Sequence, residues 1–289
     1  MRQADNQIRN GVTLRRRRIL RRVAVTVLVA CARPRMADAQ APCPQAELRA
    51  YAHNDYENAR PLADALRLGY RGVEADVFLV DHALRVGHDR RRARRGGTLE
   101  ALYLEPLGAL AAQCGGLTAD GRPFLLAVEL KEPSPPTYAA LVQLLARYSR
   151  LLTPAPDAGG AAAPVEVVLV GWHPPLSALR ADSTGLLVRL QQRLTRPEDA
   201  AVAPGSWVRL LSLDYGKTIG RRWATAASRR RWLAALREAK RAAPGRLLRV
   251  HNVPEDSRAY AALLDAGVDL IGSKQLATTR RLLLARGTP

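Results

Sequence analysis

The stretch GVEADVFLVDHALRVGHD at residues 72–89 carries two acids within an otherwise apolar, strand-like run. Val73 and Val77 favour a β-strand, and the two-residue period of a strand places Glu74 and Asp76 on the same face. Two neighbouring carboxylates on an apolar strand repel each other and are costly to remove from water. A bound divalent cation is the simplest remedy, because Mg²⁺ and Ca²⁺ take carboxylate oxygens as ligands.

Eight such runs, most of them separated by helical segments, predict one TIM (β/α)₈ barrel. They lie at residues 48–53, 73–80, 124–130, 166–171, 186–190, 208–214, 247–251 and 268–272. The fifth run, 186–190, has the weakest strand pattern, which leaves an irregular or a seven-stranded barrel as the alternative. A hairpin-like excursion is predicted between the second run and His88.

Polar residues interrupt these runs mainly at their C-terminal ends, where barrel active sites are built. The residues at these ends are His53, Glu74, Asp76, Glu129, His173, Asp214 and His251. A lone histidine at such a position is more often structural than catalytic, so we expect structural roles for His82, His173 and His251. The tryptophans are most simply packing residues, namely Trp172, Trp207, Trp223 and Trp232.

Three acids supply the predicted metal site. Glu74, Asp76 and Glu129 offer an all-oxygen site for one divalent cation, Mg²⁺ or Ca²⁺, with the amide oxygen of Asn54 as a fourth ligand. The cysteines lack the spacing of a zinc site. Paired surface acids are the alternative for the first two, but their apolar neighbours argue against exposure.

Two histidines and a lysine complete the predicted chemistry. His53 and His88 suit general acid–base catalysis on a phosphodiester, in which one removes a proton from the attacking oxygen and the other protonates the leaving oxygen. Lys131 and the cation would offset charge that grows on the phosphorus oxygens. By itself, Lys131 fits a plain ion pair with Glu129 equally well. A catalytically inert, lipid- or surface-binding barrel that keeps the motif for structure is the alternative function.

The first 39 residues are predicted to be an export signal. An arginine-rich stretch that resembles a twin-arginine signal precedes an apolar run at 23–32, which is too short for the roughly 20 residues of a membrane span. Residues 37–39 (ADA) offer a cleavage site, whereas 28–31 (LVAC) resemble a lipoprotein box. We therefore expect a barrel domain at 40–289 that is secreted, periplasmic or lipid-anchored.

Cleavage after Ala39 would leave Cys43 and Cys114, which either form a disulfide or remain as two thiols. The formal net charge is +19, and residues 1–41, with ten Arg and two Asp, hold +8 of it. The remaining basic charge is compatible with a phosphodiester substrate or an anionic membrane surface. The run Arg90 to Arg95 is either a phosphate-attracting rim or a solvated loop. Nucleic acid is disfavoured for an exported chain without an aromatic stacking stripe, and we expect a monomer.

Together the motifs resemble the phosphatidylinositol-phospholipase-C-like phosphodiesterase superfamily, which includes the glycerophosphodiester phosphodiesterases. They are His-Asn at 53–54, Glu-x-Asp at 74–76, His88 and Glu-x-Lys at 129–131. In HNDYENARPLADAL, VEADVFLV and TLEALYLEPL the chain is most similar to the branch named for altered inheritance of mitochondria protein 6.

The resemblance implies a TIM barrel and metal-dependent cleavage of a phosphodiester. It gives His53 and His88 as the acid–base pair and the three acids as metal ligands. Asn54 matches a calcium-ligand Asn of the eukaryotic phospholipases C, whereas glycerophosphodiesterases have Arg-Gly at this place. This departure argues against strict glycerophosphodiester specificity. The resemblance to the whole superfamily implies a phospholipid or a glycerophosphodiester-like compound as the substrate.

Overall fold

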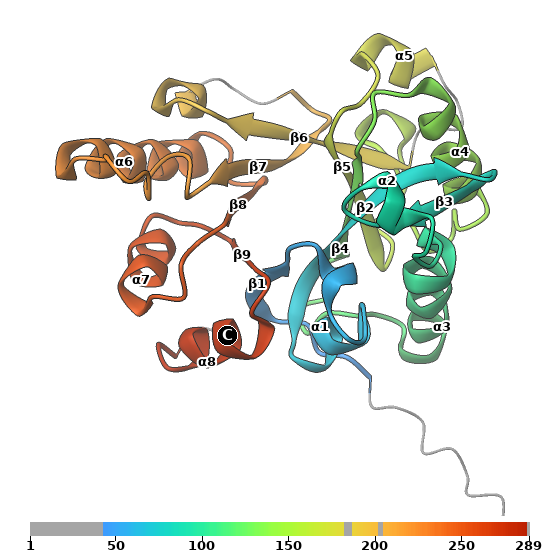
Figure 1. The fold of residues 1–289 in the computed structure, drawn as a ribbon, viewed down its shortest axis with the longest axis horizontal. Coiled ribbons are helices and arrows are strands. Elements are labelled where there is room, and N and C mark those ends of the chain that lie inside the picture. Colours follow the sequence, from blue (N-terminus) through green and yellow to red (C-terminus); the bar gives the residue numbers. More distant parts are fainter. Residues whose placement is uncertain (1–42, 182–186, 202–204, 288–289) are drawn as a thin grey trace, which may run out of the picture. The chain divides into compact units, whose positions relative to one another are not determined.

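The computed structural model describes residues 43–181, 187–201 and 205–287, and these residues build a closed barrel (Figure 1). The strands are β1 Leu48–Ala52, β2 Tyr70–Val80, β3 Ala83–Val86, β4 Phe124–Leu130, β5 Val165–Gly171, β6 Val188–Leu194, β7 Val208–Asp214, β8 Leu247–His251 and β9 Leu270–Ser273. Their order is β1-β9-β8-β7-β6-β5-β4-β2-β3, and β1 also pairs with β2, which closes the sheet. Only β3 pairs antiparallel among these nine strands, so eight parallel strands form the barrel and confirm the predicted fold.

Helices and short helical turns connect the strands. They are η1 Asp55–Glu57, α1 Ala63–Arg67, α2 Arg90–Ala93, the π-helical η2 Glu100–Leu104, α3 Glu105–Cys114, α4 Pro135–Ala146, η3 Pro156–Ala158, α5 Leu176–Ala181, η4 Pro197–Ala201, α6 Ala226–Ala242, α7 Ser257–Asp265 and α8 Leu276–Leu284. The hydroxyl of Thr225 accepts a hydrogen bond from the Ser228 amide and so caps α6. Within the described ranges, no helix combines the length and the apolar character that crossing a membrane requires.

Strand β6 is the one that the sequence predicted least well. It begins two residues later than predicted and continues to Leu194, and its pairing with β7 shifts register between Leu190 and Gln191. The polar residues at 191–193 remain partly or fully accessible, so the apolar run ends before the strand does. The strand nevertheless pairs with both neighbours, and the seven-stranded alternative is wrong.

A hairpin carries the chain out of the barrel and back to it. Asp81 and His82 have positive φ angles of 49° and 61°, as the two central residues of a type I′ turn require. Strand β3 then returns antiparallel along β2, and the Gly87 amide donates to the Asp76 carbonyl at 3.0 Å. His82 is therefore a turn residue, while His88 is brought back beside the end of β2.

The inner face of the barrel holds both apolar and charged residues. Apolar side chains packed together on this face are Tyr51, Leu125, Ala127, Val168, Val170, Leu210 and Leu270. The pairing of β2 with β4 sets Glu74 opposite Ala127, so the acid points to the same side as these residues. The larger core lies between the outer faces of the strands and the helices.

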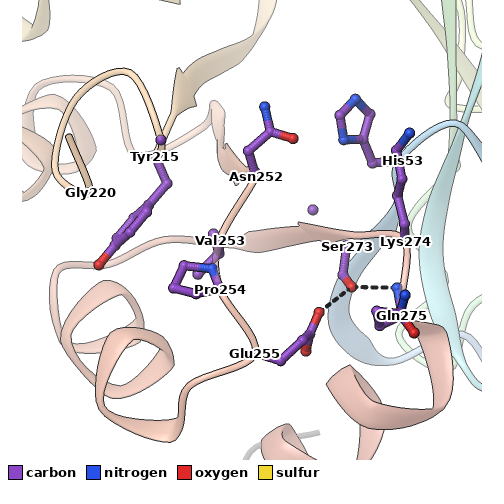
Figure 2. Close-up of a pocket in the computed structure, with 12 residues that line it drawn as sticks. His53, Tyr215, Gly220, Asn252, Val253, Pro254, Glu255, Ser273, Lys274 and Gln275 are labelled. Atoms are coloured by element: carbon purple, nitrogen blue, oxygen red, sulfur yellow. Dashed lines mark hydrogen bonds between the residues drawn. The ribbon is translucent and has the colours of Figure 1, made fainter. Parts of the chain in front are cut away.

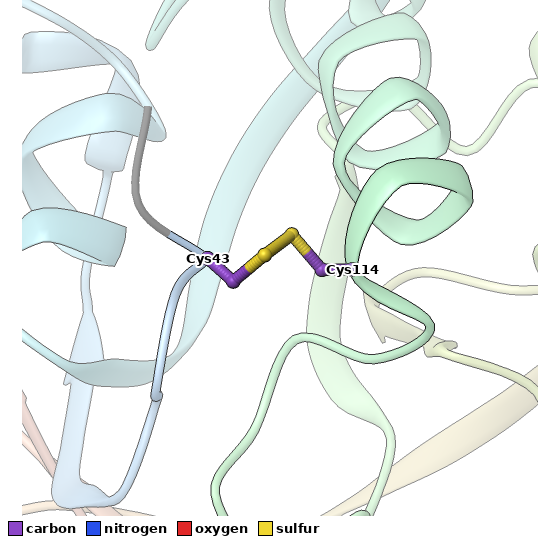
Figure 3. The surroundings of a disulfide bond; sticks show 2 residues. All are labelled: Cys43 and Cys114. Carbon is purple, nitrogen blue, oxygen red and sulfur yellow. A yellow bond between two sulfur atoms is a disulfide. The ribbon is translucent and has the colours of Figure 1, made fainter. Parts of the chain in front are cut away.

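A disulfide joins Cys43, just before β1, to Cys114 at the end of α3 (Figure 3). The Cα atoms are 5.7 Å apart, and 71 residues separate the two positions in sequence. Of the two alternatives that the sequence left open, the disulfide is the one present. The predicted export signal at 1–39 lies outside the described residues.

Candidate active site

Three carboxylates meet where β2 and β4 run side by side at their C-terminal halves. The register sets Asp76 opposite Glu129, with Glu74 two residues earlier on the same inner face. One oxygen of each carboxylate lies within 4.8 Å of the others. Glu74 and Asp76 are buried and Glu129 is half-buried. The structure thus brings together the three acids that were predicted to bind a metal.

Glu74 is held in its ionised form by a buried arginine. Its Oε2 atom accepts from Arg249 Nη1 at 2.8 Å and from the Tyr51 hydroxyl at 2.6 Å. Burial alone would raise the pKa of Glu74, but the charges of Arg249 and His53 and the Tyr51 hydrogen bond outweigh it and lower that pKa. The other oxygen, Oε1, faces His53 Nε2 at 3.8 Å.

The two oxygens of Asp76 have very different surroundings. Oδ2 accepts from the Tyr56 hydroxyl at 2.7 Å and lies 3.2 Å from His88 Nδ1 and 3.3 Å from Lys131 Nζ. Oδ1 is buried and has no hydrogen-bond partner in the described part of the chain. A buried carboxylate oxygen without a partner is costly, and a cation beside it would remove that cost.

Lys131 bridges the acids rather than pairing with one of them. Its Nζ lies 3.3 Å from Glu129 Oε1, the same distance as from Asp76. Burial, followed by the charges of Asp76 and Glu74, raises the pKa of Glu129 against the opposing effect of Lys131. Arg249 and Lys131 offset two of the three carboxylates, so one negative charge remains on a set of hard oxygen donors. These residues fit a divalent cation such as Mg²⁺ or Ca²⁺.

The first predicted catalytic histidine stands between the acids and a second histidine. The His53 amide donates to the Ser273 carbonyl at 3.0 Å, which fixes the end of β1 against β9. Its ring makes an edge-to-face contact with His251, with centroids 5.2 Å apart. Burial, opposed by the charge of Glu74 and aided by that of Arg249, lowers the pKa of His53.

His251, predicted to be structural, packs against this site. Burial, Arg249 and His53 lower the pKa of His251 to about 3, so its ring is neutral at neutral pH. Its Nε2 lies 3.7 Å from Asp214 Oδ2. His173 instead contacts the backbone carbonyl of Pro174 through Nδ1, at 2.8 Å.

The loop after β1 is anchored by a buried acid that the sequence analysis did not single out. The carboxylate of Asp55 accepts from the Leu62 amide at 2.5 Å and from Asn58 Nδ2 at 3.2 Å, and burial raises the pKa of Asp55 to about 6. Asn54, the predicted fourth ligand, is buried in this loop with a left-handed backbone (φ 51°) that asparagine tolerates well. The anchor thus fixes the segment that carries Asn54 and Tyr56.

A cavity of about 480 Å³ opens on the other side of His53 (Figure 2). His53 and Lys274 stand along one side of it, and Tyr215 stands on the other. Glu255 borders the floor, where it accepts from the Ser273 hydroxyl at 2.8 Å. His53 lines the cavity, and its Nε2 lies 3.8 Å from Glu74 Oε1, so His53 stands between the cavity and the carboxylate cluster.

Besides Asp55, sequence reasoning missed Arg249, Tyr51 and Tyr56, whose side chains all bind the carboxylates of the cluster. Arg249 is 3% exposed and also donates twice to the Ser212 hydroxyl, at 2.9 and 3.0 Å, while its guanidinium lies 4.7 Å from the centre of the Tyr51 ring. A signal was available. Arg249 and His251 alternate in the apolar run LLRVH, and the two-residue period places both on the inner face.

Comparison with known proteins finds a family match in the half of the chain that holds the cluster. Residues 45–181 match the AIM6-like phosphodiesterase domain. An altered inheritance of mitochondria protein 6 homolog from Arthroderma benhamiae is 40% identical over 63 residues, which cover 20% of this chain and 20% of the relative. The alignment therefore spans only about a fifth of the length of that curated relative. These matches confirm the predicted resemblance.

Two solved structures are similar over most of the described barrel. A mutant tryptophan synthase α-subunit from Pyrococcus furiosus has a TM-score of 0.51 and 14% identity, covering 85% of this chain and 99% of that one. This likeness supports the barrel fold alone. A glycerophosphodiester phosphodiesterase from Agrobacterium tumefaciens has a TM-score of 0.45 and 15% identity, covering 80% of this chain and 98% of that one.

Proposed function

We propose that this chain, whose residues 45–181 match a phosphodiesterase domain, is a metal-dependent phosphoric diester hydrolase acting on a phospholipid or glycerophosphodiester-like substrate. One observation carries the proposal. Asp76 Oδ1 is buried and, among the described residues, without a partner, inside a cluster of three carboxylates that two histidines border. A divalent cation held by these carboxylates would account for this arrangement and would supply positive charge to the substrate phosphate.

The metal ligands in this proposal are Glu74, Asp76 and Glu129, with Asn54 as the fourth. Mg²⁺ or Ca²⁺ held there would supply the positive charge that stabilises a phosphate in its transition state. Lys131, shared between two of the acids, places a further positive charge at the same point. We propose a single cation, because one oxygen of each of the three carboxylates lies within 4.8 Å of the others and one ion could contact all three.

The two histidines take different roles because their surroundings differ. His88 is half exposed and turns Nδ1 toward Asp76, which orients the ring and leaves Nε2 to donate a proton to the leaving oxygen. His53 borders the cavity, where it can accept a proton from a hydroxyl of the bound substrate. We propose that this hydroxyl neighbours the phosphate and attacks it, which gives a cyclic phosphate that water later opens. Direct attack by water is the competing route.

The cavity beside His53 would hold the alcohol group of the phosphodiester that carries this attacking hydroxyl. Lys274 and Tyr215 offer polar groups at its walls, and the Lys274 ammonium is held by Glu57 at 2.8 Å. The leaving alcohol would depart past His88, toward solvent.

An exported, oxidising location is part of the proposal. The Cys43–Cys114 disulfide supports it, because such bonds persist outside the reducing cytosol. The alternatives remain secretion, the periplasm and a lipid anchor at the cell envelope.

Hydrolysis of glycerophosphocholine and of a panel of lysophospholipids, which carry a hydroxyl next to the phosphodiester, tests the proposal. Bis(p-nitrophenyl) phosphate has no such hydroxyl and tests the competing attack by water. Turnover that EDTA abolishes and Mg²⁺ or Ca²⁺ restores is the expected result. His88→Ala should be inactive, whereas the matched control His82→Ala, in the hairpin turn, should keep full activity. Absence of turnover by folded protein under every condition would favour the inert binding barrel instead. Phosphorus NMR that detects no cyclic phosphate would refute the route through a neighbouring hydroxyl.

A further inference from the structure

Trp223 is a large apolar side chain that stands in solvent. It is 78% exposed, and Leu284 at 43% is the other large hydrophobic residue exposed within residues 43–181, 187–201 and 205–287. The packing role predicted for Trp223 is therefore wrong, while Trp207 and Trp232 are buried as expected. A single exposed apolar side chain is common on a folded surface, so the charges beside Trp223 decide what this one can bind.

The loop that carries Trp223 lies on the same face of the barrel as the active site. It connects the C-terminal end of β7 to the start of α6, and such loops build the catalytic face. Its first part, at Tyr215, Gly216 and Gly220, lines the cavity next to His53. Trp223 thus follows the cavity wall by only a few residues along the chain.

The loop is folded back on itself rather than frayed. The Tyr215 carbonyl accepts from the amides of Thr218 and Gly220, at 3.1 and 2.8 Å. Closer to the tryptophan, the Ala224 amide donates to the Arg221 carbonyl at 2.8 Å. Trp223 is therefore presented to solvent from a loop with a defined conformation.

One arginine without a carboxylate partner lies over the indole, and three more are close to it in sequence. The Arg222 guanidinium lies 4.9 Å from the centre of the Trp223 ring, and Arg221, Arg229 and Arg230 are exposed close by in sequence. None of these four arginines has a carboxylate within 4.0 Å among the described residues. The acids nearest in the fold are already engaged, since Glu198 pairs with Arg231 and Asp214 lies 3.7 Å from Lys217 Nζ.

We propose that these residues dock the protein on an anionic phospholipid bilayer. The docking surface consists of Arg221, Arg222 and Trp223. Tryptophan favours the boundary between acyl chains and water, and guanidinium groups bind lipid phosphates. Each arginine near an anionic leaflet strengthens binding about fivefold, and added salt weakens that part of the attraction.

The position of the surface would bring the cavity beside His53 to the source of its substrate. In this respect the inference rests on the proposed phosphodiesterase activity, although vesicle binding itself is measured without turnover. The arginine run at 90–95 carries charge without a comparable apolar anchor. There Arg90 pairs with Glu132 at 2.8 Å and Arg92 lies 3.4 Å from Asp89.

Co-sedimentation of the purified chain with vesicles tests the proposal. Vesicles of phosphatidylcholine alone are compared with vesicles that also contain phosphatidylglycerol, at low and at high salt. The chain should bind the mixed vesicles and lose binding as salt rises. Trp223→Ala should lower binding about tenfold, and Arg221→Gln with Arg222→Gln about 25-fold, given roughly a fivefold effect for each charge.

Matched variants make the result specific. Leu284→Ala removes the other exposed hydrophobic residue, and Arg94→Gln with Arg95→Gln removes equal charge elsewhere; both variants should bind vesicles as the unmodified chain does. The proposal would be overturned if Trp223→Ala bound vesicles as strongly as the unmodified chain. It would also be overturned if either control lost as much binding as the docking-surface variants. Retention on immobilised DNA that the docking-surface variants abolish, without vesicle binding, would overturn it in favour of nucleic acid.

Turnover of glycerophosphocholine, a soluble phosphodiester with a hydroxyl next to the phosphate, separates this proposal from the enzymatic one. Trp223→Ala should hydrolyse this soluble compound at the unmodified rate, because the indole lies outside the catalytic residues. A drop in that rate would show that the substitution damages the active site, and would contradict a role confined to docking. A chain that binds vesicles but never hydrolyses the compound would refute only the proposed enzymatic function.

Discussion

Replacing Arg249 with Met removes the charge that faces Glu74 while keeping a long side chain in its place. Arg249 and Glu74 are both buried, and Arg249 also donates two hydrogen bonds to the Ser212 hydroxyl. The variant keeps the acid and the Tyr51 hydroxyl that donates to it. It therefore leaves a buried carboxylate without its counter-charge.

The expected loss of stability follows from that stranded charge. Removing one partner of a buried ion pair costs about 3–5 kcal/mol. For a domain of this size a change of one kcal/mol moves the Tm by about 2–4 °C, so the Tm should fall by roughly 6–20 °C. Adding Glu74→Gln to the same chain removes the second charge. The double variant should therefore lose less free energy of unfolding than the two single variants lose together, by at least about 1 kcal/mol.

Circular dichroism during urea and thermal unfolding measures the loss. The comparison is made in EDTA, since a cation bound at Glu74 would partly replace the guanidinium. Restoring Mg²⁺ or Ca²⁺ should then reduce the difference in free energy of unfolding between Arg249→Met and the unmodified chain. A loss below about 1 kcal/mol in EDTA, or strictly additive losses in the cycle, would refute the argument that Arg249 neutralises Glu74.

Three other predictions concern different parts of the molecule. Serine at both Cys43 and Cys114 should lower the free energy of unfolding by about 4 kcal/mol, because the disulfide closes a loop of 71 residues, and reduction of the unmodified chain should have the same effect in urea unfolding. His88→Ala should lower turnover about 10²–10⁴-fold with unchanged cation affinity in calorimetry, whereas Glu129→Gln should weaken both; the reverse pattern would contradict the assigned roles. Hydrogen bonds from an arginine, which outweigh burial, lower the pKa of Asp120 to about 2, so Asp120→Asn should cost up to about 1 kcal/mol at this exposed site. That cost should be present above about pH 4 and vanish as the pH falls through about 2, and a cost unchanged at low pH would show that the charge does not matter.

Local patterns carried the barrel prediction, because each parallel strand is buried on both faces and reads as an apolar run. Strands β4, β7 and β8 have the predicted boundaries for this reason. Strand β6 does not, since three accessible polar residues occupy its second half. In this part of β6 the backbone hydrogen bonds to β7 continue, although the run of apolar side chains has ended.

The cluster of acids could be predicted in part because Glu74 and Asp76 are close in sequence and share a face. Their counter-charges could not be predicted in the same way. Arg249 lies 175 residues from Glu74, and nothing local to either residue specifies that pairing. The disulfide was equally open, because only the fold brings Cys43 near Cys114. The exposure of Trp223 likewise depends on which loop turns outward.

The ion pair between Glu74 and Arg249 joins a residue that is made early in synthesis to one that is made late. Ribosomes add about 5–20 residues per second, so Glu74 emerges roughly 10–35 seconds before the residue that neutralises it. Until β8 has been made, the partly formed barrel contains the Glu74 carboxylate without the counter-charge that its burial requires. Residues 45–181, which match the phosphodiesterase domain, therefore depend on strand β8 outside that match. A ribosome that stalls before β8 leaves Glu74 without Arg249 and its burial incomplete.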